Sequence, residues 1–207
     1  MGGGPVREDE GTAARILDAA ERLVQVRGFN GFSYADIAGE LGITKAALHY
    51  HFAGKADLGL ALIGRYASRF AEALAAIDAA GAGALRPAQR LAEYAALYLG
   101  VIQDGRMCLC GMLAAEYPTL PPPMREAVAG FFDENEAWLE KVLAEGRADG
   151  SLRFPGTARE SARMVIAALE GAMLTARPYS DAERFRAVAA SILAGLAPDA
   201  AAERSPA

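Results

Sequence analysis

The sequence predicts an all-α protein with a small N-terminal head and a larger helical-bundle domain. Three observations favour this fold class. Apolar residues recur at spacings of three and four along most of the 207-residue chain, which is the period of an amphipathic helix. Alanine, a strong helix former, supplies much of the 53% hydrophobic fraction. Gly and Pro separate the periodic segments, and no segment alternates as a strand would. We therefore expect about nine helices.

Composition limits the environment and the partners of the chain. No apolar run approaches the roughly 18 residues that cross a membrane, and no signal peptide is visible. We therefore expect a cytoplasmic protein without a membrane partner. Cys108 and Cys110 lie two residues apart, where a disulfide would close a strained ring, so both are expected to be reduced thiols. The net charge of −5 argues against indiscriminate nucleic-acid binding over the whole surface.

The first segments carry clear start and stop signals. Residues 1–11 hold Gly and charge without periodicity and are expected to form a disordered arm. A first helix follows and ends at Gly28. Ser33 opens a second helix through a capping box with Asp36, and Gly42 ends it, because glycine adopts the left-handed conformation without steric cost.

Directly after Gly42, Thr44 can cap a third helix over residues 45–51. Leu48 faces the core, and small, basic and aromatic residues occupy the other side. Two short helices meeting at a tight glycine turn form a helix-turn-helix arrangement, whose second helix enters the DNA major groove by its N-terminal end. We therefore predict a double-stranded DNA operator as partner. The expected DNA-binding residues are Ser33, Thr44, Lys45, Ala46, Ala47, His49, Tyr50, His51 and Lys55.

A family resemblance rests on this same stretch. The residues that carry it are Ser33, Ile37, Ala38, Gly42, Ile43, Lys45, Leu48, His51, Phe52, Lys55 and Leu58. Their spacing resembles the signature of TetR-family transcriptional repressors, over about 50 residues. At one position the chain departs from the family, because His49 stands where a Tyr is usual, so the phosphate contact of that Tyr is not carried over. The resemblance implies a homodimer that binds a palindromic operator and is released by a small-molecule effector.

Six further helices are expected after the head. Their segments are 55–80, 87–103, 107–116, 124–148, 157–177 and 180–196. Thr157 with Glu160 and Ser180 with Glu183 supply capping boxes for the last two. The predicted parts of the chain are the arm, a helix-turn-helix domain at 12–54, an effector-binding and dimerisation domain at 55–197 and a disordered tail at 198–207.

The last two helices offer more apolar surface than one bundle layer can cover. Small residues recur at helical spacing on both, so two copies of this helix pair can pack closely across a two-fold axis. We predict a homodimer interface here, and packing within the core of one chain is the alternative. The expected interface residues are Ala168, Gly171, Ala172, Thr175, Ala187, Ala190, Ser191 and Ala194.

Aromatic and Met side chains with few charges are expected to converge between the long helix after the head and the helices that follow it. Such a lining suits a small, largely apolar organic effector. Because the long helix begins at the head and ends in the bundle, its connectivity links the two. The expected effector-pocket residues are Tyr66, Phe70, Tyr94, Leu97, Tyr98, Cys108, Met112, Phe131, Trp138, Met164 and Met173.

Cys108 carries a hypothesis of its own. Near the start of a helix it feels the positive end of the helix dipole, and Arg106 is close in sequence; both favour the nucleophilic thiolate. The Gly105-x-x-Cys108 onset resembles repressors that sense electrophiles or oxidants through a cysteine. The alternative is that Cys108 and Cys110 are small core hydrophobes. A metal site is not expected, because Cys108 shares its helix face with Met112 alone among the sulfur ligands.

Catalysis finds little support in the sequence. The two histidines both lie on the predicted third helix, and no Gly-rich phosphate loop follows a strand. We therefore expect neither an enzyme nor a cofactor. Two alternatives to the repressor remain open, a DNA-binding architectural protein without an effector and a helical-bundle enzyme with a vestigial helix-turn-helix.

Overall fold

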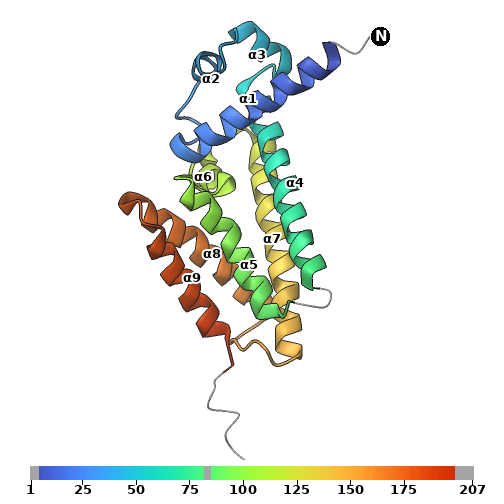
Figure 1. The fold of residues 1–207 in the computed structure, drawn as a ribbon, viewed down its shortest axis with the longest axis vertical. Helices are drawn as coiled ribbons and strands as arrows, with labels where there is room; N and C mark the ends of the chain where they lie inside the picture. Colours follow the sequence, from blue (N-terminus) through green and yellow to red (C-terminus); the bar gives the residue numbers. More distant parts are fainter. Residues whose placement is uncertain (1–4, 82–84, 199–207) are drawn as a thin grey trace, which may run out of the picture. The chain divides into compact units, whose positions relative to one another are not determined.

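The computed structural model describes residues 5–81 and 85–198, and this part of the chain is helical between its connecting turns (Figure 1). The prediction of an all-α fold is confirmed. Over these ranges the elements are α1 (Pro5–Arg27), α2 (Tyr34–Leu41), α3 (Lys45–His51), α4 (Lys55–Gly81), α5 (Pro87–Gln103), α6 (Leu109–Ala115), the 3₁₀ helix η1 (Tyr117–Thr119), α7 (Pro122–Ala148), α8 (Ala158–Ala176), the 3₁₀ helix η2 (Arg177–Tyr179) and α9 (Ala182–Leu196). No helix within these ranges is both long and apolar enough to cross a bilayer.

Two helices begin earlier than the sequence patterns predicted. Helix α1 starts at Pro5, so residues 5–11 are helical and the prediction of a disordered arm is wrong for them. Helix α7 starts at Pro122 instead of Met124. Both start at a proline, which suits the first helical position because a helix leaves the N–H there unpaired. The rest of the predicted arm, residues 1–4, and the predicted tail from residue 199 lie outside the described ranges.

The caps of the last two helices differ in outcome. The Thr157–Glu160 capping box is present: Thr157 N–H donates to Glu160 Oε2 at 2.7 Å, and Glu160 N–H donates to Thr157 Oγ1 at 3.1 Å. The Ser180–Glu183 box is wrong. The 3₁₀ turn η2 extends the chain after α8, Ser180 adopts a left-handed φ of 50°, and Asp181 becomes the cap, its side chain accepting from Glu183 N–H at 2.9 Å.

The chain forms two compact units that are not simple halves. The first unit holds the residues up to Arg69 together with Arg106–Phe131, and the second holds Phe70–Gly105 and the residues from Phe132. Helices α4 and α7 contribute residues to both units. The predicted division after residue 54 therefore falls inside the first unit.

In the first unit, α1 packs against α2 and α6, and α2 packs against α3 (Figure 1). An ion-pair network joins α4 to α1 in this unit. Glu21 on α1 is nearly buried, and its Oε2 lies 2.9 Å from Arg65 Nη2 and 2.5 Å from Arg69 Nη2. The apolar core of this unit includes Ile16, Leu23, Phe29, Ile37, Leu48, Leu58, Leu62, Leu109, Leu113 and Met124.

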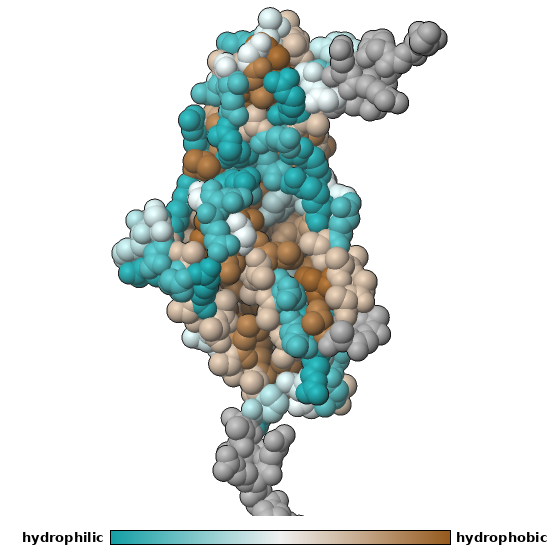
Figure 2. Space-filling view, viewed as in Figure 1, coloured by the Kyte–Doolittle hydropathy of each residue, from teal (hydrophilic) through white to brown (hydrophobic). Residues whose placement is uncertain are grey.

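In the second unit, α8 and α9 lie side by side and α5 packs against both (Figure 1). Figure 2 shows tan and brown, apolar surface over the lower part of the α8–α9 pair, while the end at the left edge of the view is teal and pale. The buried core includes Leu74, Leu91, Tyr94, Leu139, Leu143, Val165, Leu169, Met173 and Phe185. Buried Arg90 is paired on two sides, with Asp78 and with Glu145.

Candidate nucleic-acid interface

Helix α3 has one anchored face and one exposed face. Its N-cap Thr44 accepts a hydrogen bond from Ala47 N–H at 3.1 Å through the side-chain hydroxyl. Leu48 is fully buried, which fixes the rotation of the helix. Ala47 and His51 are half-buried. The exposed predicted DNA-binding residues of this helix are Lys45, Ala46, His49 and Tyr50.

The turn before α3 has the geometry that its glycine predicted. Gly42 adopts a φ of 66°, and its N–H donates to Ala38 O. At the start of α2, the backbone N–H and the hydroxyl of Ser33 both donate to Asp36 Oδ2, at 2.8 Å and 2.6 Å. These bonds, first of all the one from the hydroxyl, hold the pKa of Asp36 below its ordinary value.

A groove of about 400 Å³ lies beside the starts of α2 and α3. Tyr34 borders it with its hydroxyl donating to Phe52 O at 3.0 Å and its ring centroid 4.9 Å from that of His49. Burial, with a further contribution from Asp57, raises the pKa of Tyr34 to about 12, so this hydroxyl stays protonated and donates its hydrogen bond at physiological pH. The lining residues are Phe32, Ser33, Tyr34, Ala35, Lys45, His49 and Lys55.

Lys55 differs from the other predicted DNA-binding residues. Its Nζ donates to Phe29 O at 2.5 Å and to Phe32 O, and it lies 4.7 Å and 4.3 Å from the centroids of the same two rings. Desolvation lowers the pKa of Lys55, and the negative charges of Glu116 and Asp36 oppose this shift. The ammonium group thus donates its hydrogen bonds to the turn between α1 and α2. This favours a structural role for Lys55 over the predicted contact with DNA.

Two family models match the chain. The model described as bacterial regulatory proteins of the tetR family matches residues 16–62, which contain α2, α3 and the turn between them. The model described as the tetracyclin repressor-like C-terminal domain matches residues 87–192, half of the chain. The chain belongs to the TetR family.

Other TetR-family regulators align over most of the chain. The HTH-type transcriptional repressor NemR of Escherichia coli K12 is 27% identical over 168 residues, which cover 80% of this chain and 84% of NemR. The transcriptional regulator AcuR of Cereibacter sphaeroides is 30% identical over 167 residues, which cover 78% of this chain and 74% of AcuR. A solved TetR-family regulator from Agrobacterium tumefaciens superposes with a TM-score of 0.87 at 34% identity, over 92% of this chain and all of that one. The solved structure of E. coli NemR in its reduced form superposes with a TM-score of 0.78 at 26% identity, over 91% of this chain and 99% of the NemR chain.

The predicted effector residues of this TetR-family chain fall into two sets, one in each unit. In the first unit, Cys108 caps α6: its Sγ accepts from Gly111 N–H at 3.4 Å and from the Tyr66 hydroxyl at 3.7 Å. The Tyr66 ring lies 5.6 Å from that of Phe131. Cys108 is 1% exposed and Cys110 is fully buried, so both thiols are enclosed, and they are not joined in a disulfide. Met112 is half-buried in the same helix.

In the second unit, an aromatic cluster connects α4, α5 and α7. Phe70 lies 6.0 Å from both Tyr94 and Tyr98, and Tyr94 stacks on Trp138 with centroids 5.6 Å apart. The Tyr94 hydroxyl lies 3.1 Å from that of Tyr98 and donates to Asn135 Oδ1 at 3.1 Å. Among the described residues, two buried donors beside this cluster have no acceptor, Trp138 Nε1 and Arg90 Nε.

The remaining predicted pocket residues are less uniform. Met173 is buried in α8 and Leu97 is half-buried in α5. Met164 is 45% exposed and borders a different hollow, the groove between α8 and α9, so its assignment to the aromatic pocket is not supported by its position.

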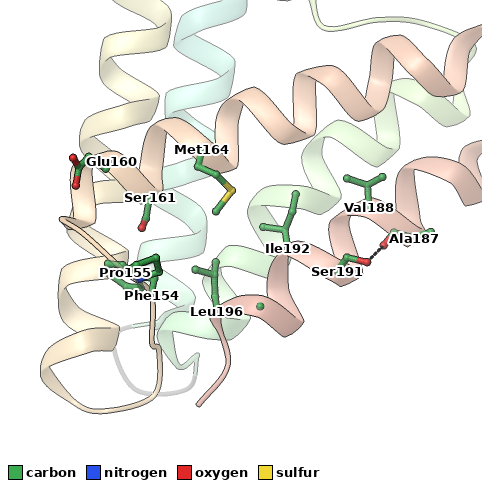
Figure 3. A pocket seen from close by; sticks show the side chains of 11 residues that line it. Phe154, Pro155, Glu160, Ser161, Met164, Ala187, Val188, Ser191, Ile192 and Leu196 are labelled. Carbon is green, nitrogen blue, oxygen red and sulfur yellow. Dashed lines mark hydrogen bonds between the residues drawn. The ribbon is translucent and has the colours of Figure 1, made fainter. Parts of the chain in front are cut away.

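That groove has a volume of about 660 Å³ (Figure 3). Helix α8 contributes Glu160, Ser161 and Met164, helix α9 contributes its small and branched side chains, and Phe154 and Pro155 close one end. Of the predicted dimer residues, Ala187 and Ser191 line the groove, Ala168 is half-buried and Ala172 is buried inside the unit. The exposed remainder is Gly171, Thr175, Ala190 and Ala194.

Sequence reasoning missed Glu116, whose carboxylate accepts a hydrogen bond from the backbone N–H of Phe29 at 2.6 Å. The two residues are 87 positions apart, so no local pattern signals the contact. It missed Arg90 for the same reason, because the residue lies in an apolar helix pattern and its two carboxylate partners come from other helices.

The lowered pKa of Asp36 gives a testable pH dependence. A carboxylate whose pKa is lower in the folded state stabilises the fold above the unfolded value of 3.8, and this contribution disappears as the pH falls through the folded pKa. We expect Asp36→Asn to have a lower Tm than wild type at pH 7 and the difference to narrow below about pH 4. Thermal unfolding followed by circular dichroism measures it; a difference that stays constant down to pH 3 would contradict the assignment.

Proposed function

We propose that this protein is a homodimeric transcriptional repressor that binds a palindromic operator through α3 of each protomer and is released by a small apolar or electrophilic effector. The observation that carries the DNA-binding part is the exposed side of α3, where Lys45, His49 and Tyr50 surround the small Ala46 while Leu48 anchors the opposite face. Small residues let a helix approach base edges, and the longer side chains reach bases or phosphates.

Charge explains why such binding needs two copies. With a net charge of −5 the chain as a whole repels DNA, so attraction must come from local groups such as Lys45. A two-fold dimer doubles these contacts and requires half-sites about 34 Å apart, or a multiple of that distance.

Exposed apolar side chains on α8 and α9 support the dimer. Met164 is 45% exposed, Leu174 61% and Val188 38%, and the groove between the two helices is open in a single chain. A second copy of the same helix pair would cover this surface with small and branched side chains of matching chemistry.

Cys108 supports an electrophilic effector. The two donors directed at its sulfur, Gly111 N–H and the Tyr66 hydroxyl, stabilise negative charge there. Addition of the thiol across an activated C=C bond forms a C–S bond, and the thiol proton ends on the neighbouring carbon. Because Cys108 is buried, the reaction requires the first turn of α6 to open. The similarity to NemR, which has been solved in a reduced form, fits a role for the thiol state.

The aromatic cluster of the second unit supports a noncovalent effector as the alternative. Its packed rings form an apolar environment, while the Trp138 Nε1 and Arg90 Nε donors lack acceptors among the described residues. An aromatic or aliphatic molecule with one hydrogen-bond acceptor matches this combination.

The first test compares DNA binding with and without an electrophile. We expect the purified protein to bind DNA from its own upstream region in fluorescence anisotropy, and N-ethylmaleimide to weaken that binding by at least about tenfold. Cys108→Ser should bind equally well but ignore the reagent, while Cys110→Ser keeps the response. A response to N-ethylmaleimide that persists in Cys108→Ser would exclude this thiol as the sensor. Equal binding to a scrambled DNA sequence would contradict the repressor proposal.

The salt dependence of operator binding tests the contact at Lys45. If Lys45 neutralises one phosphate in each half-site, Lys45→Ala should flatten the slope of log K against log[NaCl] by about 2. Lys141, an exposed lysine in the second unit, provides the control, and Lys141→Ala should leave the slope unchanged. Parallel lines for Lys45→Ala and wild type would place Lys45 away from the phosphates.

The dimer interface is tested at Leu174. Placing a charge on this exposed position of α8 should prevent two copies from closing the interface, because the cation would be buried without a partner. Sedimentation velocity should then show wild type as a dimer and Leu174→Arg as a monomer of 21.7 kDa. Leu60→Arg, at a 42% exposed position in the first unit, is the control and should remain dimeric. A dimeric Leu174→Arg would place the interface elsewhere.

A further inference from the structure

The turn between α1 and α2 is held by side chains from distant parts of the chain. Gly28 ends α1 with its N–H donating to Val24 O at 2.8 Å, and its φ of 83° sends the chain into the left-handed region. The next residues, Phe29 to Phe32, leave backbone amides and carbonyls that no helix pairs. Phe29 and Phe32 are buried, and buried backbone groups need partners other than bulk water.

Glu116 pairs the amides. Its Oε2 accepts from Phe29 N–H at 2.6 Å and its Oε1 accepts from Asn30 N–H at 3.2 Å. The Asn30 side-chain amide donates to Thr119 Oγ1 at 2.8 Å, three residues after Glu116. Hydrogen bonds to a charged acceptor are stronger than those between neutral groups. Gly28 leaves room for this approach, because a Cβ there would lie 2.8 Å from Glu116 Oε1.

Lys55 pairs the carbonyls. It donates to Phe29 O and Phe32 O, so the peptide groups of one short turn are held by a carboxylate on their N–H side and by an ammonium on their C=O side. The charges of Lys55 and Glu116 also attract each other. The turn is therefore clamped by one residue from the start of α4 and one from the end of α6.

The segment that ends in Glu116 is fixed at its other end to the same helix α1. Met107 N–H donates to Gln25 O at 3.3 Å, one turn before Gly28, and α6 packs along α1. Residues 107–119 thus contact α1 at both ends. Cys108 caps the start of α6, and Glu116 accepts hydrogen bonds from the turn that leads into α2.

We propose that Glu116 is a positioning residue for operator binding: its carboxylate holds the α1–α2 turn in the conformation that presents α3 to DNA, without touching DNA itself. This inference rests on the proposed repressor function. The backbone of residues 107–119 joins the Cys108 cap of α6 to the Glu116 contact with this turn.

The test compares Glu116→Ala and Glu116→Gln with Glu126→Ala, an exposed glutamate on α7 in the same unit. In hydrogen exchange without DNA, Glu116→Ala should exchange faster in residues 29–41 and unchanged in residues 87–103. In anisotropy, Glu116→Ala should bind the operator about tenfold more weakly, and Glu116→Gln, which keeps one acceptor oxygen, should recover part of the loss. The salt slope should equal that of wild type, because no phosphate contact is removed.

The outcomes separate the two proposals. Wild-type exchange in residues 29–41 together with wild-type operator affinity in Glu116→Ala would overturn the positioning role, and so would a flatter salt slope, which indicates direct contact with DNA. If wild type itself shows no operator preference, the repressor proposal fails, and the exchange comparison alone then decides whether Glu116 holds the turn. Glu126→Ala should match wild type in every measurement.

Discussion

Helices α2 and α3 have eight and seven residues, and helices this short are not stable alone in water. This constraint governs the whole first unit, because every group that α3 exposes depends on what is buried behind it. Ile37 and Leu48 supply the apolar anchors, and the polar groups of Ser33 and Thr44 pair with partners at the two helix starts. On the exposed side of α3, His49 contacts Ala53 O and the Tyr34 ring, while the exposed side chains of Lys45, Ala46 and Tyr50 are accessible for recognition.

Paired charges extend this support beyond the short helices. Glu21 on α1 is tied to both Arg65 and Arg69 on α4, and Arg69 is the residue at which the first unit leaves α4. In the second unit, buried Arg90 is matched by two carboxylates in the same way. Glu21 and Arg90 are themselves nearly buried, and a buried charge that loses its partners destabilises the fold. The two networks thus join α1 to α4 in the first unit and α5 to α4 and α7 in the second.

The sequence predicted what local chemistry determines and missed what depends on long-range partners. Helical periodicity located the helices, and Gly42, Thr44 and the Thr157–Glu160 box act through neighbours a few residues away, so their geometry followed from the sequence. The start of α1 at Pro5 was not predicted, because residues 5–11 are mostly polar and carry no apolar period. The hydrogen bonds that Lys55 donates and those that Glu116 accepts join residues 23 or more positions apart, and such contacts leave no periodic signal in the sequence. The predicted effector residues are divided between the two units, which their shared apolar and aromatic character does not signal.

The first unit is discontinuous in the sequence, and this has a consequence for its synthesis. Chains emerge from the ribosome N-terminus first, and domains generally fold as units as they appear. Residues 1–69 contain the entire helix-turn-helix, yet the carboxylate that pairs the amides of Phe29 and Asn30 arrives only with residue 116. When α3 has emerged from the ribosome, the amides of the α1–α2 turn therefore still lack their carboxylate partner. Completion of the DNA-reading head is delayed until α6 has been made, which ties the maturation of the head to the synthesis of the segment that carries its candidate thiol.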